Sequence, residues 1–183
     1  MNEYGTLIGN NSIRFERLLP GPIERVWAYL VEPDKRALWL AGGPMRLATG
    51  GEVALQFHNA ELSRNDDSAP EKYRAIENSG NVYGHIVACD PPYRLIFTWG
   101  DAPDMTAAES SEVDIALAVE GESVQLVLTH RRLKPQVMGS VGAGWHTHLG
   151  ILGDRIDGRE PRLFWRTHTA LEAEYVERIG LEH

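Results

Sequence analysis

Histidine is the residue type in this chain with the clearest capacity for chemistry, because an imidazole exchanges a proton near neutral pH. His85 begins an apolar stretch with strand character, His130 ends another, and His148 borders an apolar helical stripe. Each could serve as a general acid or base in an interior cavity. Each could equally be a hydrogen-bonded side chain at the edge of the core. The sequence leaves both interpretations open.

The spacing of the histidines does not favour a metal site. His146 and His148 are two residues apart, so on a helix their side chains point about 160° away from each other. The chain contains no His-Glu-x-x-His, Cys-x-x-Cys, Gly-x-Ser-x-Gly or Gly-x-Gly-x-x-Gly pattern. We therefore assign no catalytic residue and no metal ligand, and we expect no cofactor.

Aromatic side chains are the second group that indicates binding. The chain has five tryptophans, which either fill the core or form the wall of a cavity for an apolar or aromatic ligand. Together with the histidines and neighbouring apolar positions they define a candidate cavity wall. It comprises Trp39, Phe57, His85, Phe97, Trp99, Leu117, His130, Trp145, His148, Leu149 and Leu152.

A helix between Gly144 and Gly158 is the element expected to position these residues. Its apolar side chains recur at i, i+4, i+7 and i+11 and form one stripe: Trp145, Leu149, Leu152 and Ile156. Gly150 and Gly153 lie on another flank, where each costs about 1 kcal/mol relative to alanine. Such a helix needs either close packing or free space on that flank.

The rest of the chain predicts an α+β fold in which antiparallel strands precede the long helix. Alternating apolar residues indicate strands at 12–19, 53–57, 84–89, 94–99, 111–119 and 123–133. Two short helices follow the first strand, within 22–40. A polar connection at 59–83 is either a lid or a solvated insertion. We expect a flexible N-terminus at 1–11, one domain at 12–158, a helical extension at 159–180 and a tag remnant at 181–183.

Composition limits the class of partner. Acidic residues number 26 and basic residues 18, a net charge of −8 with no basic stripe, which disfavours nucleic acid. No apolar run is long enough to span a membrane, and no secretory signal is visible. The single cysteine is compatible with a reducing compartment, so we expect a cytoplasmic protein. The last helix could cover its own domain or pair with a second copy, which leaves monomer and homodimer open.

Three segments resemble a known superfamily. They are Pro22–Leu30 with Leu38-Trp39, then Gly84–Trp99, then Leu126–His130 followed by Gly144–Gly158. In this order they are similar to the START-like (SRPBCC, Bet v I-type) superfamily, and most similar to homologues of the C-terminal domain of the activator of the 90-kDa heat-shock-protein ATPase. The resemblance implies a helix-grip fold, a curved antiparallel sheet around a long C-terminal helix with a cavity between them.

The resemblance does not select one function, since function depends on the site rather than on the fold. The superfamily includes carriers of hydrophobic ligands, polyketide cyclases and chaperone regulators. Our first expectation is binding of a small hydrophobic or amphipathic molecule in the cavity. The alternatives are a cavity enzyme of cyclase or hydrolase type, with His85, His130 or His148 as acid or base, and a regulator that contacts a chaperone through its surface.

Overall fold

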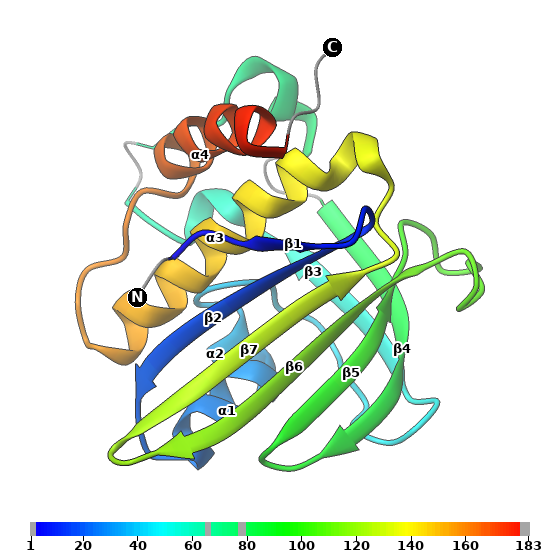
Figure 1. The fold of residues 1–183 in the computed structure, drawn as a ribbon, viewed down its shortest axis with the longest axis vertical. Coiled ribbons are helices and arrows are strands. Elements are labelled where there is room, and N and C mark those ends of the chain that lie inside the picture. The colour runs from blue at the N-terminus through cyan, green and yellow to red at the C-terminus, as the bar shows by residue number, and fades with distance from the viewer. Residues whose placement is uncertain (1–2, 65–66, 77–79, 180–183) are drawn as a thin grey trace.

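A computed structural model describes residues 3–64, 67–76 and 80–179 of the chain. One seven-stranded antiparallel sheet, in the order β1-β2-β7-β6-β5-β4-β3, curves around the long helix α3 (Figure 1). Its strands are β1 (Thr6–Ile8), β2 (Ser12–Pro20), β3 (Glu52–Phe57), β4 (Gly80–Asp90), β5 (Arg94–Trp99), β6 (Ser111–Glu120) and β7 (Ser123–Arg131). This is the α+β helix-grip architecture expected from the sequence.

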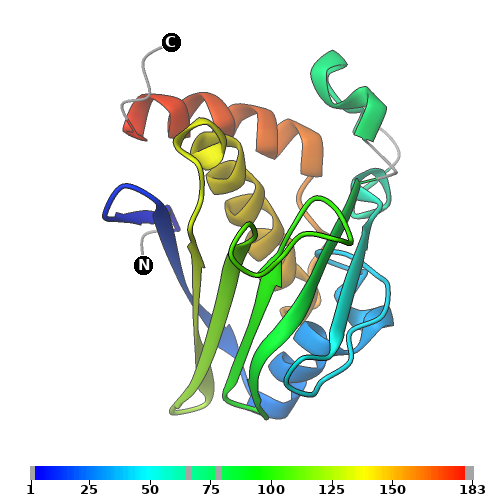
Figure 2. The ribbon, with the colours of Figure 1, turned by 90° about the vertical axis from the view of Figure 1, so that its right-hand side faces the viewer.

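Four α-helices and three 3₁₀ helices complete the part of the chain that the structure describes. The α-helices are α1 (Ile23–Val31), α2 (Pro33–Arg36), α3 (Met138–Ile156) and α4 (Phe164–Ile179), and the 3₁₀ helices are η1 (Asn59–Glu61), η2 (Glu71–Ile76) and η3 (Pro135–Val137). Figure 2 shows α4 and η2 at the same end of the molecule, and α1 and α2 at the opposite end. No helix among the described residues is both long and apolar enough to cross a membrane.

The apolar stripe of α3 packs on the inner face of the sheet as predicted. Trp145, Leu149, Leu152 and Ile156 are all buried. The helix begins at Met138, six residues before the predicted start at Gly144. Glycines in this first half are the reason that sequence patterns missed it, and they allow α4 to approach closely. A Cβ at Gly142 would lie 2.9 Å from the Tyr175 ring.

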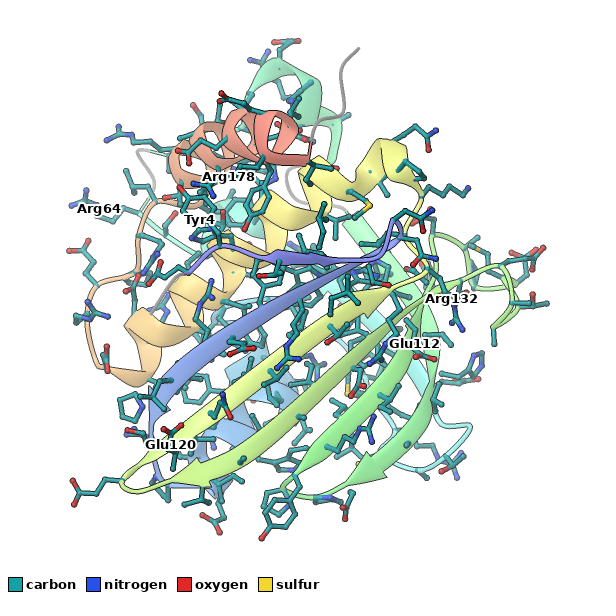
Figure 3. All side chains as sticks on the ribbon, in the orientation of Figure 1. Tyr4, Arg64, Glu112, Glu120, Arg132 and Arg178 are labelled. Carbon is teal, nitrogen blue, oxygen red and sulfur yellow. The ribbon has the colours of Figure 1, made fainter. Side chains whose placement is uncertain are left out.

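The expectation of a flexible N-terminus over 1–11 is wrong for part of that segment. Thr6–Ile8 pairs with Ser12–Arg14 of β2, although all three β1 side chains are exposed. Order here comes from backbone hydrogen bonds, which leave no apolar pattern to detect. Figure 3 shows Tyr4 beside Arg178 of α4, whose guanidinium carbon lies 3.7 Å from the centre of the tyrosine ring. The predicted tag remnant at 181–183 lies outside the described residues.

The polar connection at 59–83 divides between short helices and the sheet. Its first part contains η1 and η2, and β4 begins at Gly80, four residues before the predicted Gly84. Asp67, in the part before η2, accepts hydrogen bonds from the backbone amides of Trp165 (2.6 Å) and Arg166 (3.0 Å). The Ser63 hydroxyl accepts one from the amide of Phe164 (3.0 Å). These contacts satisfy the first three amides of α4, which no residue of the helix itself can bond.

Candidate functional site

The candidate site is a pocket of about 270 Å³ between the sheet and the helices, where β3, β4, α3 and α4 meet. We call it the aromatic pocket, because five carbocyclic or indole rings and two imidazoles line it: Phe57, Tyr73, Trp99, Phe164, Trp165, His148 and His168. The rings interlock closely. Tyr73 stacks on Trp165 with centroids 5.5 Å apart, and Phe57 meets Trp99 edge-on at 5.8 Å.

A second pocket of about 220 Å³ lies on the other side of Trp99. Trp99 and Val141 line both pockets and separate them. The second pocket also includes Ser111, His130 and Arg132, so it is more polar than the aromatic pocket. A side-chain movement at Trp99 would therefore change the shape of both spaces.

His130 is held by a continuous hydrogen-bond chain. The Trp145 indole Nε1–H, which can only donate, gives its hydrogen to His130 Nδ1 at 2.9 Å. The neutral ring must then carry its proton on Nε2, 2.8 Å from the Ser111 hydroxyl, which in turn donates to the Trp99 carbonyl at 3.0 Å. Burial lowers the pKa of His130 to about 3. Both ring nitrogens are committed, so this histidine positions Trp145 and Trp99 rather than transferring protons.

His148 keeps one ring nitrogen available. Its Nδ1–H donates to the Trp39 carbonyl at 2.7 Å, which leaves Nε2 as an acceptor. No described residue forms a hydrogen bond with that Nε2, and the side chain lines the aromatic pocket. Burial lowers the pKa of His148 to about 4, so the ring is neutral at pH 7. A neutral imidazole of such low basicity is a hydrogen-bond acceptor and a weak general base.

Three buried polar atoms in the wall of the aromatic pocket have no hydrogen-bond partner within the described part of the chain. They are the carbonyl oxygen of the Asn59 side chain, Trp165 Nε1 and His168 Nδ1. Most buried polar atoms in folded proteins are paired, and an unpaired one costs about 1–3 kcal/mol. These atoms lie behind the rings and have almost no accessible surface, so a ligand would reach them only after a side-chain movement in the wall.

The same end of the molecule is closed by contacts between η2 and α4. Lys72 Nζ and the Tyr73 hydroxyl both reach the Glu172 carboxylate, at 2.5 and 2.6 Å. Burial, followed by the hydrogen bond to Glu172, raises the pKa of Tyr73, so the phenol stays protonated and keeps donating. The segment that carries η1 and η2 thus borders the pocket together with α4.

The structure brings together only part of the predicted cavity wall. Phe57, Trp99 and His148 line the aromatic pocket, and His130 and Trp145 support it. Leu149 lines a different pocket beside β2. Four of the predicted residues are packed in the core away from these spaces, namely Trp39, Phe97, Leu117 and Leu152.

The prediction is wrong for His85, whose side chain is exposed. It lies on the opposite face of β4 from the buried Ile86, because successive strand residues alternate between faces. Sequence reasoning also missed Asn59, Tyr73, Phe164, Trp165 and His168. The sequence predicts a helical extension at 159–180, which contains Phe164, Trp165 and His168, but that prediction cannot show that these side chains line a pocket.

No group of three or more His, Cys, Asp or Glu side chains among residues 3–64, 67–76 and 80–179 is arranged to hold a metal ion. His146 and His148 point to different partners, Tyr175 and Trp39 respectively, as their spacing predicted.

A helix gripped by a curved antiparallel sheet, with pockets at its end, defines a member of the START-like class. Residues 20–156 match the model of the family described as "Activator of Hsp90 ATPase homolog 1-like protein". The match covers most of the chain, so the chain belongs to this family. No protein with a curated description matches it.

Solved structures agree with this assignment. The solution structure of the protein encoded by gene BPP1335 from Bordetella parapertussis is 41% identical, with a TM-score of 0.80 over 100% of this chain and 93% of that one. CalU16 from Micromonospora echinospora is 26% identical, with a TM-score of 0.67 over 92% and 88% of the two chains. DynU16, described as a putative protein in the dynemicin biosynthetic locus, shares the fold at 20% identity, with a TM-score of 0.63 over 85% and 51%.

Proposed function

We propose that this protein binds a small aromatic molecule carrying hydroxyl or carbonyl substituents in the aromatic pocket. The observation that carries the proposal is the pairing of an aromatic wall with His148, whose Nδ1 is bonded to the Trp39 carbonyl and whose Nε2 is an acceptor without a partner among the described residues. Flat aromatic walls favour flat ligands through stacking and apolar burial. The unpaired His148 Nε2 favours a ligand with a hydroxyl group that donates to it, and the unpaired atoms behind the rings would favour further polar substituents if the wall opens.

The geometry supports binding over catalysis. His148 is the side chain in the pocket best placed to contact a reacting atom, and its pKa of about 4 lies well below the pH of a neutral compartment. A general base works best when its pKa is near the working pH. His148 Nε2 therefore serves as an acceptor for a ligand hydroxyl, a role that adds orientation without proton transfer.

The pocket is small, at the lower end of the volumes typical of small-molecule sites. It is bordered by α4, whose first turn is held by Asp67 and Ser63, and by Asn59 and Tyr73 of the segment before β4. The pocket is open to solvent on one side, so a bound ligand would contact the rings of the wall with one face and remain partly exposed.

Gly144 provides the test. It lines the aromatic pocket, and a Cβ built there meets no atom within 4 Å. A Gly144→Leu variant should fold at least as well as the parent, because leucine favours helix, and should place its side chain in the pocket. We would titrate both proteins with a panel of hydroxylated and carbonyl-bearing aromatics and follow amide NMR shifts and tryptophan fluorescence.

The expected result is a saturable change in the parent protein that Gly144→Leu abolishes. Gly153→Ala is the matched control, since Gly153 is also a glycine of α3 but lines the pocket beside β2. That variant should bind the same aromatics with unchanged affinity. Equal binding by Gly144→Leu, or saturable shifts confined to other surfaces, would show that the aromatic pocket is not the site.

A further inference from the structure

Arg17 is a buried arginine without an adequate counter-charge among the described residues. It lies on the inner face of β2, in the same row as Ile13, Phe15 and Leu19, and only 6% of it is exposed. Its Nη1 donates to the Glu16 carbonyl at 2.8 Å, but Nε and Nη2 have no hydrogen-bond partner in the described part of the chain. No carboxylate of the described residues lies within 4 Å of its guanidinium.

Other arginines of this protein show what those two nitrogens normally do. Arg94 and Arg162 each use the Nε–Nη2 edge to hold both oxygens of one carboxylate, that of Asp114 and that of Asp154 respectively. Arg36 is buried as completely as Arg17, yet all three of its guanidinium nitrogens donate to backbone carbonyls. In Arg17 the edge that fits a carboxylate is the part left unused.

Arg17 lines a pocket of about 460 Å³, which we call the edge pocket. It lies beside residues 17–20 of β2, in the part of this strand that does not pair with β1. Its wall combines Arg17 and Arg162 with apolar and small residues, Leu19, Leu149, Gly150 and Gly153. The edge pocket and the aromatic pocket share no lining residue. It therefore forms a separate space, whose wall also carries Arg159 and the acidic residues Glu3, Glu122 and Asp157.

The other charges of the edge pocket are largely paired. Arg162 is held by Asp154, and Arg159 by Asp157 at 2.7 Å. Glu3 lies at the rim, 3.5 Å from both Arg162 Nη1 and His146 Nε2. Burial acts to raise the pKa of Glu3, but Arg162 and Arg17 outweigh it and lower the pKa, so the field at this point favours a carboxylate.

We propose that the edge pocket binds a small carboxylate with a short apolar chain. Its carboxylate pairs with the Nε–Nη2 edge of Arg17, whose two nitrogens are covered in this structure and are reached when the Arg17 side chain turns toward the pocket, and its chain lies along Leu19, Leu149 and Gly153. The half-exposed Glu3 carboxylate lies at the rim of the edge pocket, in the positive potential of Arg162 and Arg17, and competes with the incoming carboxylate. The site is independent of the aromatic pocket and takes a different class of ligand.

The test uses sodium acetate, butyrate and hexanoate, with hexanol and inorganic phosphate for comparison. NMR would follow the Arg17 Nε–H and the backbone amides of Gly150 and Gly153. We expect saturable shifts with the three carboxylates and an affinity that rises with chain length, by at most about fourfold per methylene. Hexanol should not bind, and phosphate should bind more weakly than hexanoate.

Variants separate the parts of the proposal. Arg17→Met should weaken hexanoate binding by about tenfold or more, and Glu3→Gln should tighten it by about twofold to fivefold. Arg14→Met is the matched control, since Arg14 lies on the same strand but is paired with Glu16 on the outer side. Neither Arg14→Met nor Gly144→Leu should alter hexanoate binding.

Several results would overturn the proposal: no saturable shift with any carboxylate, phosphate binding tighter than hexanoate, or hexanoate binding that survives Arg17→Met. If Arg17→Met fails to fold, Glu3→Gln decides alone, because it leaves Arg17 in place. Unchanged or weaker hexanoate affinity in Glu3→Gln would then reject the site.

Discussion

Replacing Asp67 with alanine measures how strongly α4 is held over the aromatic pocket. The carboxylate is 8% exposed and accepts hydrogen bonds from two α4 amides and from the Ser63 hydroxyl at 3.1 Å. Loss of a helix N-cap costs about 0.5–2 kcal/mol, and a hydrogen bond to a charged group contributes about 1.5–3 kcal/mol. These values overlap rather than add, so we expect a loss of about 2–3 kcal/mol in the free energy of unfolding.

For a domain of this size such a loss lowers Tm by about 5–10 °C. Urea unfolding followed by tryptophan fluorescence gives the free energy, and amide hydrogen exchange shows whether Trp165 and Arg166 lose protection first. Asp67→Asn should lose less, because the side-chain oxygen still accepts one hydrogen bond. The exposed Asp104→Ala serves as control, with a change of about 0.5 kcal/mol or less. A loss below about 0.5 kcal/mol in Asp67→Ala, with unchanged exchange at α4, would refute the capping role.

Three further predictions concern the core and the pocket wall. His130→Leu should destabilise by about 2–3 kcal/mol in denaturant unfolding, because the Trp145 N–H loses its buried acceptor; a neutral effect would contradict the hydrogen-bond chain. Gly84→Ala should cost about 3 kcal/mol or prevent folding, because its Cβ would overlap the Thr98 carbonyl oxygen, and a parent-like Tm would disprove that contact. The pKa of His148, lowered by burial to about 4, means that the unfolded chain binds the proton first as the pH falls. The stability from neutral His148 is complete above about pH 6.5 and declines by about 1.4 kcal/mol per pH unit toward pH 4; an unchanged slope in His148→Gln would show another source.

Local periodicity explains how much of the fold could be predicted from the sequence. The buried stripe of α3 and the alternation in β5 to β7 follow directly from side-chain geometry along the chain. Those patterns also predicted the positions of Phe57, Trp99 and His148. They failed for β1, which is ordered by backbone pairing, and for His85, where the face of β4 was not determined.

The remainder of the site depends on contacts between segments distant in sequence. Asp67 caps a helix that begins almost a hundred positions later, and Tyr73 stacks on Trp165. The glycine flank of α3 illustrates the same limit. Gly150 predicted close packing or free space, and the structure places the Arg162 guanidinium there, so near that a Cβ on residue 150 would overlap it. The periodicity of a sequence does not predict which distant residue packs against a given glycine.

The glycines in the first half of α3 restrict how α4 can move relative to α3. Gly139 and Gly142 leave a shallow groove that fits Val176 and Tyr175 of α4, where added Cβ atoms would lie 3.2 and 2.9 Å away. Two helices engaged in this way cannot slide along each other without forcing larger side chains into contact. Since the aromatic pocket is open to solvent on one side, a small ligand needs no such movement to enter it. A larger ligand would require α4 to tilt away from α3 as a unit, together with the segment that caps it. The packing of these two helices would then set the upper limit on the size of a bound molecule.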